Sequence, residues 1–468
     1  MPSGTDAATS GTADAGSDSF YVAHQKIYPR EISGRFNRLR TITVITLLGL
    51  FYLVPWLRWN GRQAVLFDLP ARKFYILGLT FWPQDFFLLS WLLIIAALSL
   101  FFFTALAGRL WCGYACPQTV WTEVFVWMER LAEGKRSQRM KLDLAPWTVH
   151  KVLRKGAKQV LWIGFALWTG YTFVGFFTPI VTLGREILAL SLGPWESFWI
   201  VFYGFATYGN AGYLREQVCK YMCPYARFQS AMFDHDTLIV SYDRSRGEPR
   251  GARARGSDYR AKGLGDCIDC KVCVQACPTG IDIRNGLQYE CIACTACIDA
   301  CDQVMDRMNY PRGLIRYATE RSMEGGATRV LRPRILIYGA VLGAFIVGFF
   351  LAVGMRNLLG IDVLRDRNAL YRVLADGTIE NVYTVRLLNK DELAHQLRLS
   401  AEGPIGLALD ADRDAYTVGG GEVLTIAVRL RMPGPQPGGS HKVVLRATAV
   451  DAPQLTRASD TRFISPAG

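Results

Sequence analysis

One cysteine spacing occurs twice between residues 266 and 302, and it constrains the fold more than any other feature of the chain. Each run has the form C-x2-C-x2-C-x3-C. The first run contains Cys267, Cys270, Cys273 and Cys277, and the second contains Cys291, Cys294, Cys297 and Cys301. Three closely spaced thiolates bind one 4Fe–4S cluster, while the fourth cysteine of the run ligates the other cluster. The spacing therefore predicts one cluster on Cys267, Cys270, Cys273 and Cys301, and a second on Cys291, Cys294, Cys297 and Cys277.

A pair of zinc sites is the main alternative, because C-x2-C pairs also bind zinc. Zinc gives no reason for the same spacing to occur twice, so we favour two clusters. The segment resembles a bacterial two-cluster ferredoxin, with one departure: Cys277 is followed by Pro278, whereas Cys301 is followed by Asp302. Such a lobe needs only a small apolar core, because metal–thiolate bonds contribute to its folding.

Five apolar stretches each approach or exceed the roughly 20 residues that cross a bilayer. They are Thr41–Leu57, Phe86–Gly108, Gln159–Gly184, Ser197–Leu214 and Ile335–Met355. They predict a membrane protein with five transmembrane α-helices. The formal net charge is +13, but Lys and Arg gather beside these stretches, as membrane topology requires. The charge therefore does not indicate a nucleic-acid partner.

The distribution of Lys and Arg also predicts the orientation and the domains, because cytoplasmic segments carry the excess of positive charge. We expect a disordered, basic cytoplasmic segment at 1–40, a four-span membrane domain at 41–234, a cytoplasmic linker and ferredoxin domain at 235–334, a fifth transmembrane helix at 335–355, and a periplasmic domain at 356–468. The basic stretch at 244–262 is expected to be a solvated linker that helps to fix this orientation.

The last hundred residues contain short segments in which apolar and polar residues alternate, at 382–388, 395–401, 422–432 and 441–450. Segments rich in Gly, Pro and Asp separate them, as expected for β-strands joined by turns. The pattern predicts an immunoglobulin-like β-sandwich. This domain has no cysteine, so we expect a docking or structural module.

Two further cysteine pairs have the form C-x3-C-P and follow the second and fourth apolar stretches. They are Cys112 with Cys116 and Cys219 with Cys223. Residues four apart lie on one face of a helix, although the following Pro117 and Pro224 disfavour helix at the second cysteine of each pair.

Two thiolates suit Cu(I), and the two pairs together would give a four-sulfur site. The alternatives are reducible disulfides and inert buried cysteines. Met222, His150 and His235 are weaker candidates for additional ligands. No Gly-rich nucleotide-binding motif follows a predicted strand, so direct use of NAD(P)H or a flavin is not indicated.

The sequence resembles the FixG/RdxA/CcoG family of cytochrome c oxidase accessory proteins. The resemblance is carried by WCGYACPQ at 111–118, CKYMCPYARFQ at 219–229, the eight-cysteine segment, and residues 366–368, 377–383 and 389–390 in the last domain. It implies a protein of the bacterial cytoplasmic membrane that reduces Cu(II) to Cu(I) for copper delivery during assembly of cbb-type oxidases.

On this hypothesis Cys112, Cys116, Cys219 and Cys223 bind copper and are the catalytic residues. The implied partners are copper-delivery and oxidase assembly proteins and a cytoplasmic or quinol electron donor; a homo-oligomer remains open. Related membrane ferredoxins of the NapH and NosR kind serve quinol-linked electron transfer, which is one alternative function. A non-enzymatic assembly scaffold is another.

Overall fold

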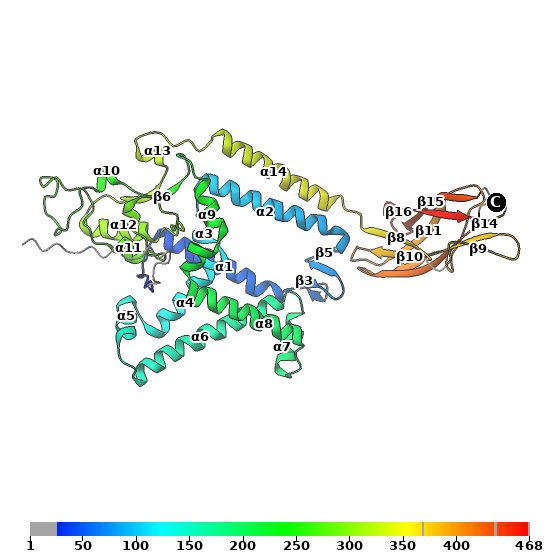
Figure 1. Ribbon diagram of the computed structural model, residues 1–468, viewed down its shortest axis with the longest axis horizontal. Helices are drawn as coiled ribbons and strands as arrows, with labels where there is room; N and C mark the ends of the chain where they lie inside the picture. Colours follow the sequence, from blue (N-terminus) through cyan, green and yellow to red (C-terminus); the bar gives the residue numbers. More distant parts are fainter. Residues whose placement is uncertain (1–25, 367–368, 435–437, 467–468) are drawn as a thin grey trace, which may run out of the picture.

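The computed structural model describes residues 26–366, 369–434 and 438–466. Residues 1–25, most of the segment predicted to be disordered, lie outside these ranges. Figure 1 shows a cysteine-rich lobe at one end of the molecule, long helices in the middle and a β-domain at the other end. The three sequence regions with different composition therefore occupy three different parts of the molecule.

Within the described residues, three helical segments are long and apolar enough to cross a membrane, namely Arg35–Trp56, Pro83–Ala107 and Pro333–Gly354. They are built on α1 (Arg35–Leu53), α2 (Phe86–Ala107) and α14 (Pro333–Gly354). Helix α2 packs against α14. At this contact the indole N–H of Trp91 donates a hydrogen bond of 3.1 Å to the carbonyl oxygen of Phe345.

The prediction of five transmembrane helices is not confirmed, because the third and fourth stretches fold differently from a simple span. The third stretch is divided between α6 (Val149–Val174) and α7 (Ile180–Leu188), with a turn before Pro179. Helix α6 begins ten residues before the predicted span, and its first turns carry Lys151, Arg154, Lys155 and Lys158. The fourth stretch forms α8 (Pro194–Thr207), which continues into the π-helical segment η3 (Tyr208–Leu214). Helices α6 and α8 pack side by side.

Short elements complete the helical and cysteine-rich parts. The helices are α3 (Leu110–Tyr114), α4 (Pro117–Glu133), α5 (Arg136–Leu144), α9 (Pro224–Ala231), α10 (Arg244–Gly247), α11 (Val272–Ala276), α12 (Ala296–Met308), α13 (Glu320–Met323), the 3-10 helices η1 (Val54–Trp56), η2 (Pro83–Asp85) and η5 (Ile283–Asn285), and the π-helix η4 (Val218–Met222). The strands are β1 (Arg58–Trp59), β2 (Arg62–Gln63), β3 (Val65–Asp68), β4 (Lys73–Ile76), β5 (Leu79–Phe81), β6 (Ile239–Tyr242) and β7 (Ile315–Ala318). Proline begins α4, α9 and α14, where its fixed φ and missing N–H suit the first helical position.

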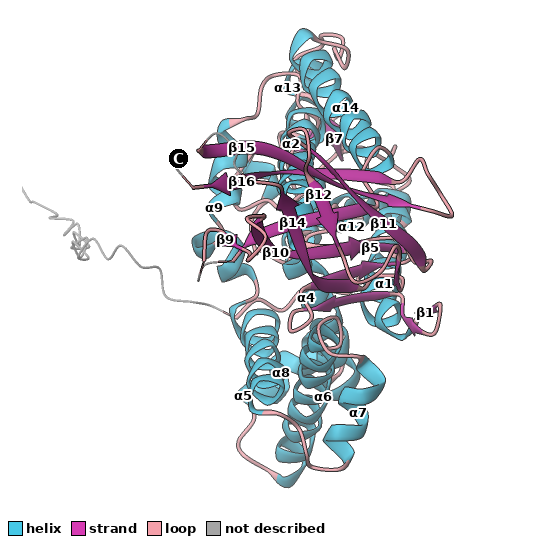
Figure 2. Ribbon diagram, turned by 90° about the vertical axis from the view of Figure 1, so that its right-hand side faces the viewer, coloured by secondary structure: helices cyan, strands magenta, loops and turns pink. Residues whose placement is uncertain are grey.

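The C-terminal part is a sandwich of two antiparallel sheets. Its strands are β8 (Leu359–Arg365), β9 (Arg372–Val373), β10 (Ile379–Asn389), β11 (His395–Glu402), β12 (Ala408–Asp410), β13 (Tyr416–Val418), β14 (Val423–Met432), β15 (Gly439–Ala449) and β16 (Thr456–Ser465). One sheet has the order β12-β14-β10-β8 with β9 beside β10, and the other has the order β13-β11-β15-β16. Figure 2 shows these long strands in front of the helices. All four predicted strand segments are strands in the structure.

The core of the sandwich follows from the alternation in its sequence. Successive side chains of a strand point to opposite faces, so every second residue enters the core. Tyr383, Val385 and Leu387 of β10 are fully buried, as are Val428 and Leu430 of β14. Side chains from both sheets form one continuous apolar cluster.

The segment between α1 and α2 folds into small antiparallel sheets, which the sequence did not reveal. It contacts the sandwich through two ion pairs. Lys390 lies 2.9 Å from Asp85, and Arg62 lies 2.7 Å from Glu392. These contacts fix the sandwich against the end of the helical part that is remote from the cysteine-rich lobe.

Candidate metal centre

The eight cysteines of the lobe line two small, partly open spaces in two crossed sets. The first space has an empty volume of about 350 Å³ and is lined by Cys267, Cys270, Cys273 and Cys301. The second has an empty volume of about 320 Å³ and is lined by Cys277, Cys291, Cys294 and Cys297, with Cys273 at its edge. The fourth cysteine of each run therefore faces the other run's three.

The spacing of these thiols fits clusters. Among the described residues, no set of three or more His, Cys, Asp or Glu side chains converges closely enough to hold a single metal ion. A 4Fe–4S cluster binds one thiolate at each corner, so its four ligands lie farther apart than the ligands of a single ion. Each space is lined by a set of four cysteines, one for each iron of a 4Fe–4S cluster, so the residues present fit two such clusters, which would supply one-electron transfer when bound.

The two C-x3-C-P motifs have the same local design in the structure. Cys112 lies in α3 and Cys219 in the π-helix η4, whereas Cys116 and Cys223 are the extended residues that precede α4 and α9. Each proline begins the next helix, so the second cysteine lies at a bend, as the prolines predict. The two cysteines of a pair therefore do not share the face of one continuous helix.

The two motifs lie close to each other and to the second cysteine run of the lobe. Cys116 interacts electrostatically with both Cys219 and Cys223. Cys112 and Cys219 pack against an apolar cluster that contains Cys294. The structure thus brings together two pairs that are a hundred residues apart in the sequence.

Gly113 and Tyr114 of the first motif make the close contact with the lobe. A Cβ on Gly113 would lie 2.6 Å from the carbonyl oxygen of Ala293, so only glycine fits against this backbone. The hydroxyl groups of Tyr114 and Thr295 are 2.8 Å apart and hydrogen-bonded. Both lobe residues flank Cys294, and the motif therefore lies against the predicted ligand loop of the second cluster.

Arg109 connects the end of α2 with the lobe and with α9. The sequence analysis treated it only as one of the Lys and Arg residues beside an apolar stretch. Its side chain is buried and donates hydrogen bonds to the backbone carbonyls of Tyr289, Cys291 and Ala226. It also interacts electrostatically with Cys112. No sequence signal separated Arg109 from its basic neighbours, because its role depends on tertiary contacts.

Gln229 is a second residue that sequence analysis missed. It is fully buried, and its side-chain oxygen lies 3.3 Å from Sγ of Cys112, which donates the hydrogen bond. The amide of Gln229 donates in turn to the hydroxyl of Thr104, at 3.3 Å. Gln229 lies at the end of the CKYMCPYARFQ motif, so its position within that motif was the available signal.

Burial makes the thiolate forms of these cysteines costly. It raises the pKa of Cys112 to about 12, that of Cys219 to about 12 and that of Cys294 to about 12. The guanidinium of Arg109 opposes this shift for Cys112 and Cys219. A bound metal ion replaces the proton of a thiol and stabilises the thiolate in the same way. A bound metal ion would therefore offset the cost of burial for these thiolates.

The two candidate histidines have other partners. Nδ1 of His235 lies 2.8 Å from a carboxylate oxygen of Glu320, and both side chains are largely exposed. His150 is exposed and accepts a hydrogen bond of 3.3 Å from Arg154. Met222 is also exposed. These side chains are directed to solvent, unlike the buried cysteines.

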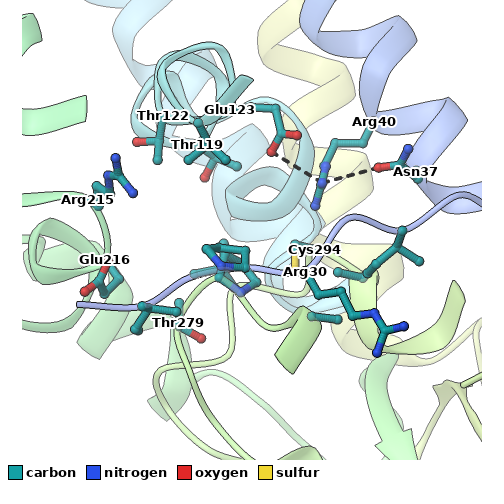
Figure 3. A pocket seen from close by; sticks show the side chains of 18 of the residues that line it. Arg30, Asn37, Arg40, Thr119, Thr122, Glu123, Arg215, Glu216, Thr279 and Cys294 are labelled. Carbon is teal, nitrogen blue, oxygen red and sulfur yellow. Dashed lines mark hydrogen bonds and ion pairs between the residues drawn. The ribbon is translucent and has the colours of Figure 1, made fainter. Parts of the chain in front are cut away.

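A pocket with an empty volume of about 910 Å³, partly open to solvent, lies between the lobe and the helices. Cys219 and Cys294 both line it, together with the first turn of α1. Figure 3 shows Arg40 directed toward Glu123 and Asn37 at the upper edge of this pocket. Arg40 and Arg130 lie 3.3 and 3.4 Å from carboxylate oxygens of Glu123.

Comparison with known proteins supports iron–sulfur binding by these cysteines. Residues 214–320 match a 4Fe–4S dicluster domain, residues 89–136 match a 4Fe–4S binding domain, and residues 349–466 match the Ig-like fold at the C-terminus of FixG. The nitrogen fixation protein FixG of Rhizobium meliloti is 39% identical over 422 residues, which cover 82% of this chain and 80% of that protein. The chain belongs to the FixG/RdxA/CcoG family.

Two more family members, both from Cereibacter sphaeroides, are similar along most of their length. Protein RdxB is 41% identical over 419 residues, which cover 86% of this chain and 88% of RdxB. Protein RdxA is 39% identical over 405 residues, which cover 84% of this chain and 85% of RdxA. The two 4Fe–4S matches contain all twelve cysteines, including both C-x3-C-P pairs. This family member is therefore an iron–sulfur electron-transfer protein.

Proposed function

We propose that the protein is a cupric reductase of the cytoplasmic membrane that supplies Cu(I) for assembly of a cbb-type cytochrome c oxidase. The observation that carries this proposal is the contact between the two thiol pairs and the second cysteine run. Gly113 and Tyr114 of the first pair lie against the backbone beside Cys294. A copper ion held by these pairs would lie next to the iron–sulfur part of the protein.

The ligand sets proposed for the clusters are the two crossed sets, Cys267, Cys270, Cys273 and Cys301, and Cys277, Cys291, Cys294 and Cys297. Copper is the substrate, and the pairs Cys112 with Cys116 and Cys219 with Cys223 receive it, two thiolates to each ion, because no three such side chains of the described residues converge on one ion. Copper binding releases the protons of the receiving thiols, and each Cu(II) accepts one electron from an external donor and becomes Cu(I). Thiolates favour the soft Cu(I) product over harder ions.

Arg109 and Gln229 position the receiving thiols. Arg109 fixes the end of α2 against the carbonyl of Cys291, and its charge favours the thiolate form of Cys112. Gln229 accepts the hydrogen bond of the Cys112 thiol. Both residues act through Cys112, so they are positioning residues.

The topology that we propose keeps five crossings. Helices α6 and α8 would cross as a closely packed pair, because α6 is 26 residues long and the exposed face of α8 carries Phe198, Phe202 and Phe205. The amino terminus and the lobe would then be cytoplasmic and the sandwich periplasmic. The sandwich would meet copper-delivery or oxidase assembly proteins there.

Copper reduction by the purified protein tests the proposal. Anaerobically prepared protein should contain about eight iron atoms, four for each cluster. After chemical reduction it should convert Cu(II) to Cu(I), detected with a Cu(I)-specific chelator. Cys112→Ser and Cys223→Ser should lower the rate at least about tenfold, as expected for loss of a metal ligand. Met222→Ala, an exposed change in the same motif, is the matched control.

Two results would contradict the proposal. Cysteine variants that reduce Cu(II) as fast as the wild type would show that copper binds elsewhere. An iron content near twelve would assign the four cysteines to a third four-iron cluster instead of copper.

Quinol-linked electron transfer is the second candidate function, and the pocket beside α1 favours it. The pocket begins at the first turn of a helix long enough to cross a membrane, and its walls reach Cys219 and Cys294. Its walls combine apolar surface with polar and charged groups such as Arg40 and Glu123, which would hydrogen-bond the oxygens of a quinol ring. Reduction of the protein by a short-chain quinol, lost in Arg40→Leu, would favour this function over the first.

A further inference from the structure

The basic stretch at 244–262, which its composition predicts to be a solvated linker, is mostly exposed and also makes hydrogen bonds with the lobe. It folds onto the outer side of the lobe, beside the first cysteine run. The backbone N–H of Gly251 donates a hydrogen bond of 3.2 Å to the carbonyl of Cys267, and that of Cys267 donates to Gly247 at 3.4 Å. Arg253 donates to the carbonyls of Gly265 and Cys267. The stretch is therefore hydrogen-bonded to the lobe and forms part of its surface.

The same surface exposes a predicted cluster ligand. Of the twelve cysteines, Cys270 is exposed, while the other eleven are buried or partly buried. Cys270 belongs to the first set, and the second set contains Cys294, against which Cys112 and Cys219 pack. The exposed thiol of Cys270 thus belongs to one predicted cluster, and the proposed copper site lies beside the other.

Positive charge surrounds this exposed edge. Residues 244–271 contain eight Lys and Arg and four Asp and Glu. Three of the four acids lie close to arginines: Asp266 lies 2.5 Å from Arg246, Asp269 lies 2.5 Å from Arg284, and Glu248 lies 3.6 Å from the exposed Arg250. The exposed Lys and Arg side chains of this stretch, which we call the basic collar, are Arg244, Arg250, Arg255, Arg260, Lys262 and Lys271, and Asp258 is the exposed acid among them.

Lys271 and Arg250 lie close to Asp269, the residue that precedes the exposed Cys270. Lys271 follows Cys270 in the chain, and both cations act electrostatically on the neighbouring Asp269. Figure 1 shows α10 and the loop that follows it on the outer side of the lobe, away from α2 and α14. A membrane surface at the ends of these helices would not reach the collar. The collar is therefore open to a soluble partner.

We propose that the basic collar around Cys270 is the docking site of a soluble, acidic electron-carrier protein that donates electrons to this protein one at a time. This proposal rests on the proposed function, for which it names the donor. The carrier loses one electron at each encounter, and this chain gains it. Complementary charge accelerates such encounters and makes them sensitive to salt. The small exposed edge suits a transient complex of the kind that redox partners form.

Binding of an acidic carrier to the complete protein tests the proposal. The full-length, iron-loaded chain in nanodiscs of zwitterionic lipid is titrated with an oxidised acidic two-iron ferredoxin at low and at high salt. We expect binding that weakens as salt rises. Arg250→Glu and Lys271→Glu, combined, should weaken binding at low salt about tenfold, because charge steering contributes at least that factor.

Arg329→Glu is the control. It reverses an exposed charge on the connection between the lobe and α14, so it should leave binding unchanged. Unchanged iron content and visible absorption of each variant show that the lobe is intact. Cu(II) reduction by chemically reduced collar variants should equal that of the wild type. Failure of this last measurement counts against the proposed function and not against the docking site.

Three outcomes would overturn the docking site. Binding that does not depend on salt would exclude a charge-driven encounter. Collar variants that bind the carrier as well as the control would place the contact elsewhere. Loss of binding to phosphatidylserine vesicles without loss of carrier binding would show that the collar meets lipid instead.

Discussion

The cysteine-rich lobe and the β-sandwich differ in what stabilises them. The sandwich has one continuous core in which Tyr383, Leu387 and Val428 are fully buried between two sheets. The main apolar cluster of the lobe is smaller and includes Cys267 and Cys273 among its buried members. Most of the lobe is loop, so bonds from cysteines to metal must supply what apolar burial does not. The comparison predicts that the two regions respond independently to different treatments.

Removal of iron should give the largest difference between them. Anaerobic chelation, or Cys294→Ala together with Cys270→Ala, should unfold most of the lobe, because the remaining cysteines would no longer be joined through bound clusters. The sandwich should remain folded, since none of its strands contains a cysteine. Limited proteolysis followed by mass spectrometry measures both regions in one sample. Loss of both regions together would show that they form one cooperative unit.

A cavity in the sandwich should have the reverse effect. Leu430 is fully buried in β14, and Leu430→Ala removes buried volume at a cost of about 2–5 kcal/mol in the free energy of unfolding. The urea midpoint of the sandwich, measured by proteolysis of the full chain, should fall, while the iron content should not change. Arg429→Ala on the exposed face of the same strand is the control. A fall in iron content in Leu430→Ala would remove the distinction between the regions.

How far the sequence predicted each region depends on the range of the interactions that form it. Cysteine spacing and strand alternation are local, and both appear in the structure: the crossed cysteine sets line two spaces, and the four predicted strand segments are strands. The third and fourth spans were less well predicted. Hydropathy alone does not show that the turn before Pro179 divides one apolar stretch between two helices.

The contacts between regions were not predictable from the sequence. Gly113 and Ala293 are 180 residues apart, and nothing local shows that one backbone lies against the other. The same holds for Arg109, whose hydrogen bonds reach two distant segments. The composition of the basic stretch at 244–262 records its charge but does not show its hydrogen bonds with Cys267.

A side chain at Gly113 should test how closely the helical part depends on the lobe. In Gly113→Ala the new methyl group would meet backbone atoms of Ala293 and Ile292, and relief of such a contact costs about 1–3 kcal/mol. We expect full iron content but slower Cu(II) reduction, because the first motif would move away from the lobe. Gly164→Ala in α6, which has open space around it, is the control. Equal copper reduction in both variants would show that the close contact is not needed.

The smallest effect should be a pH dependence confined to the sandwich. Burial opposes the charged form of His395, but hydrogen bonds with Asp451, at 2.6 Å, and Asp391, at 3.1 Å, outweigh it and raise its pKa above 6.5. A group whose pKa is raised on folding binds its proton more tightly in the folded state. Its contribution to stability is therefore complete below pH 6.5 and is lost as the pH rises through the folded-state pKa.

The urea midpoint of the sandwich should accordingly fall as the pH rises through this window, while iron retention by the lobe should not follow the same curve. The change should be modest, because the carboxylate of Asp451 is about half exposed and solvent screens the interaction. His395→Gln should flatten the curve, and His441→Gln, a change of the other histidine in the sandwich, should preserve it. If His395→Gln kept the full pH dependence, the interaction with the two carboxylates would not be its source. A matching pH dependence of iron retention would instead show that the two regions are coupled.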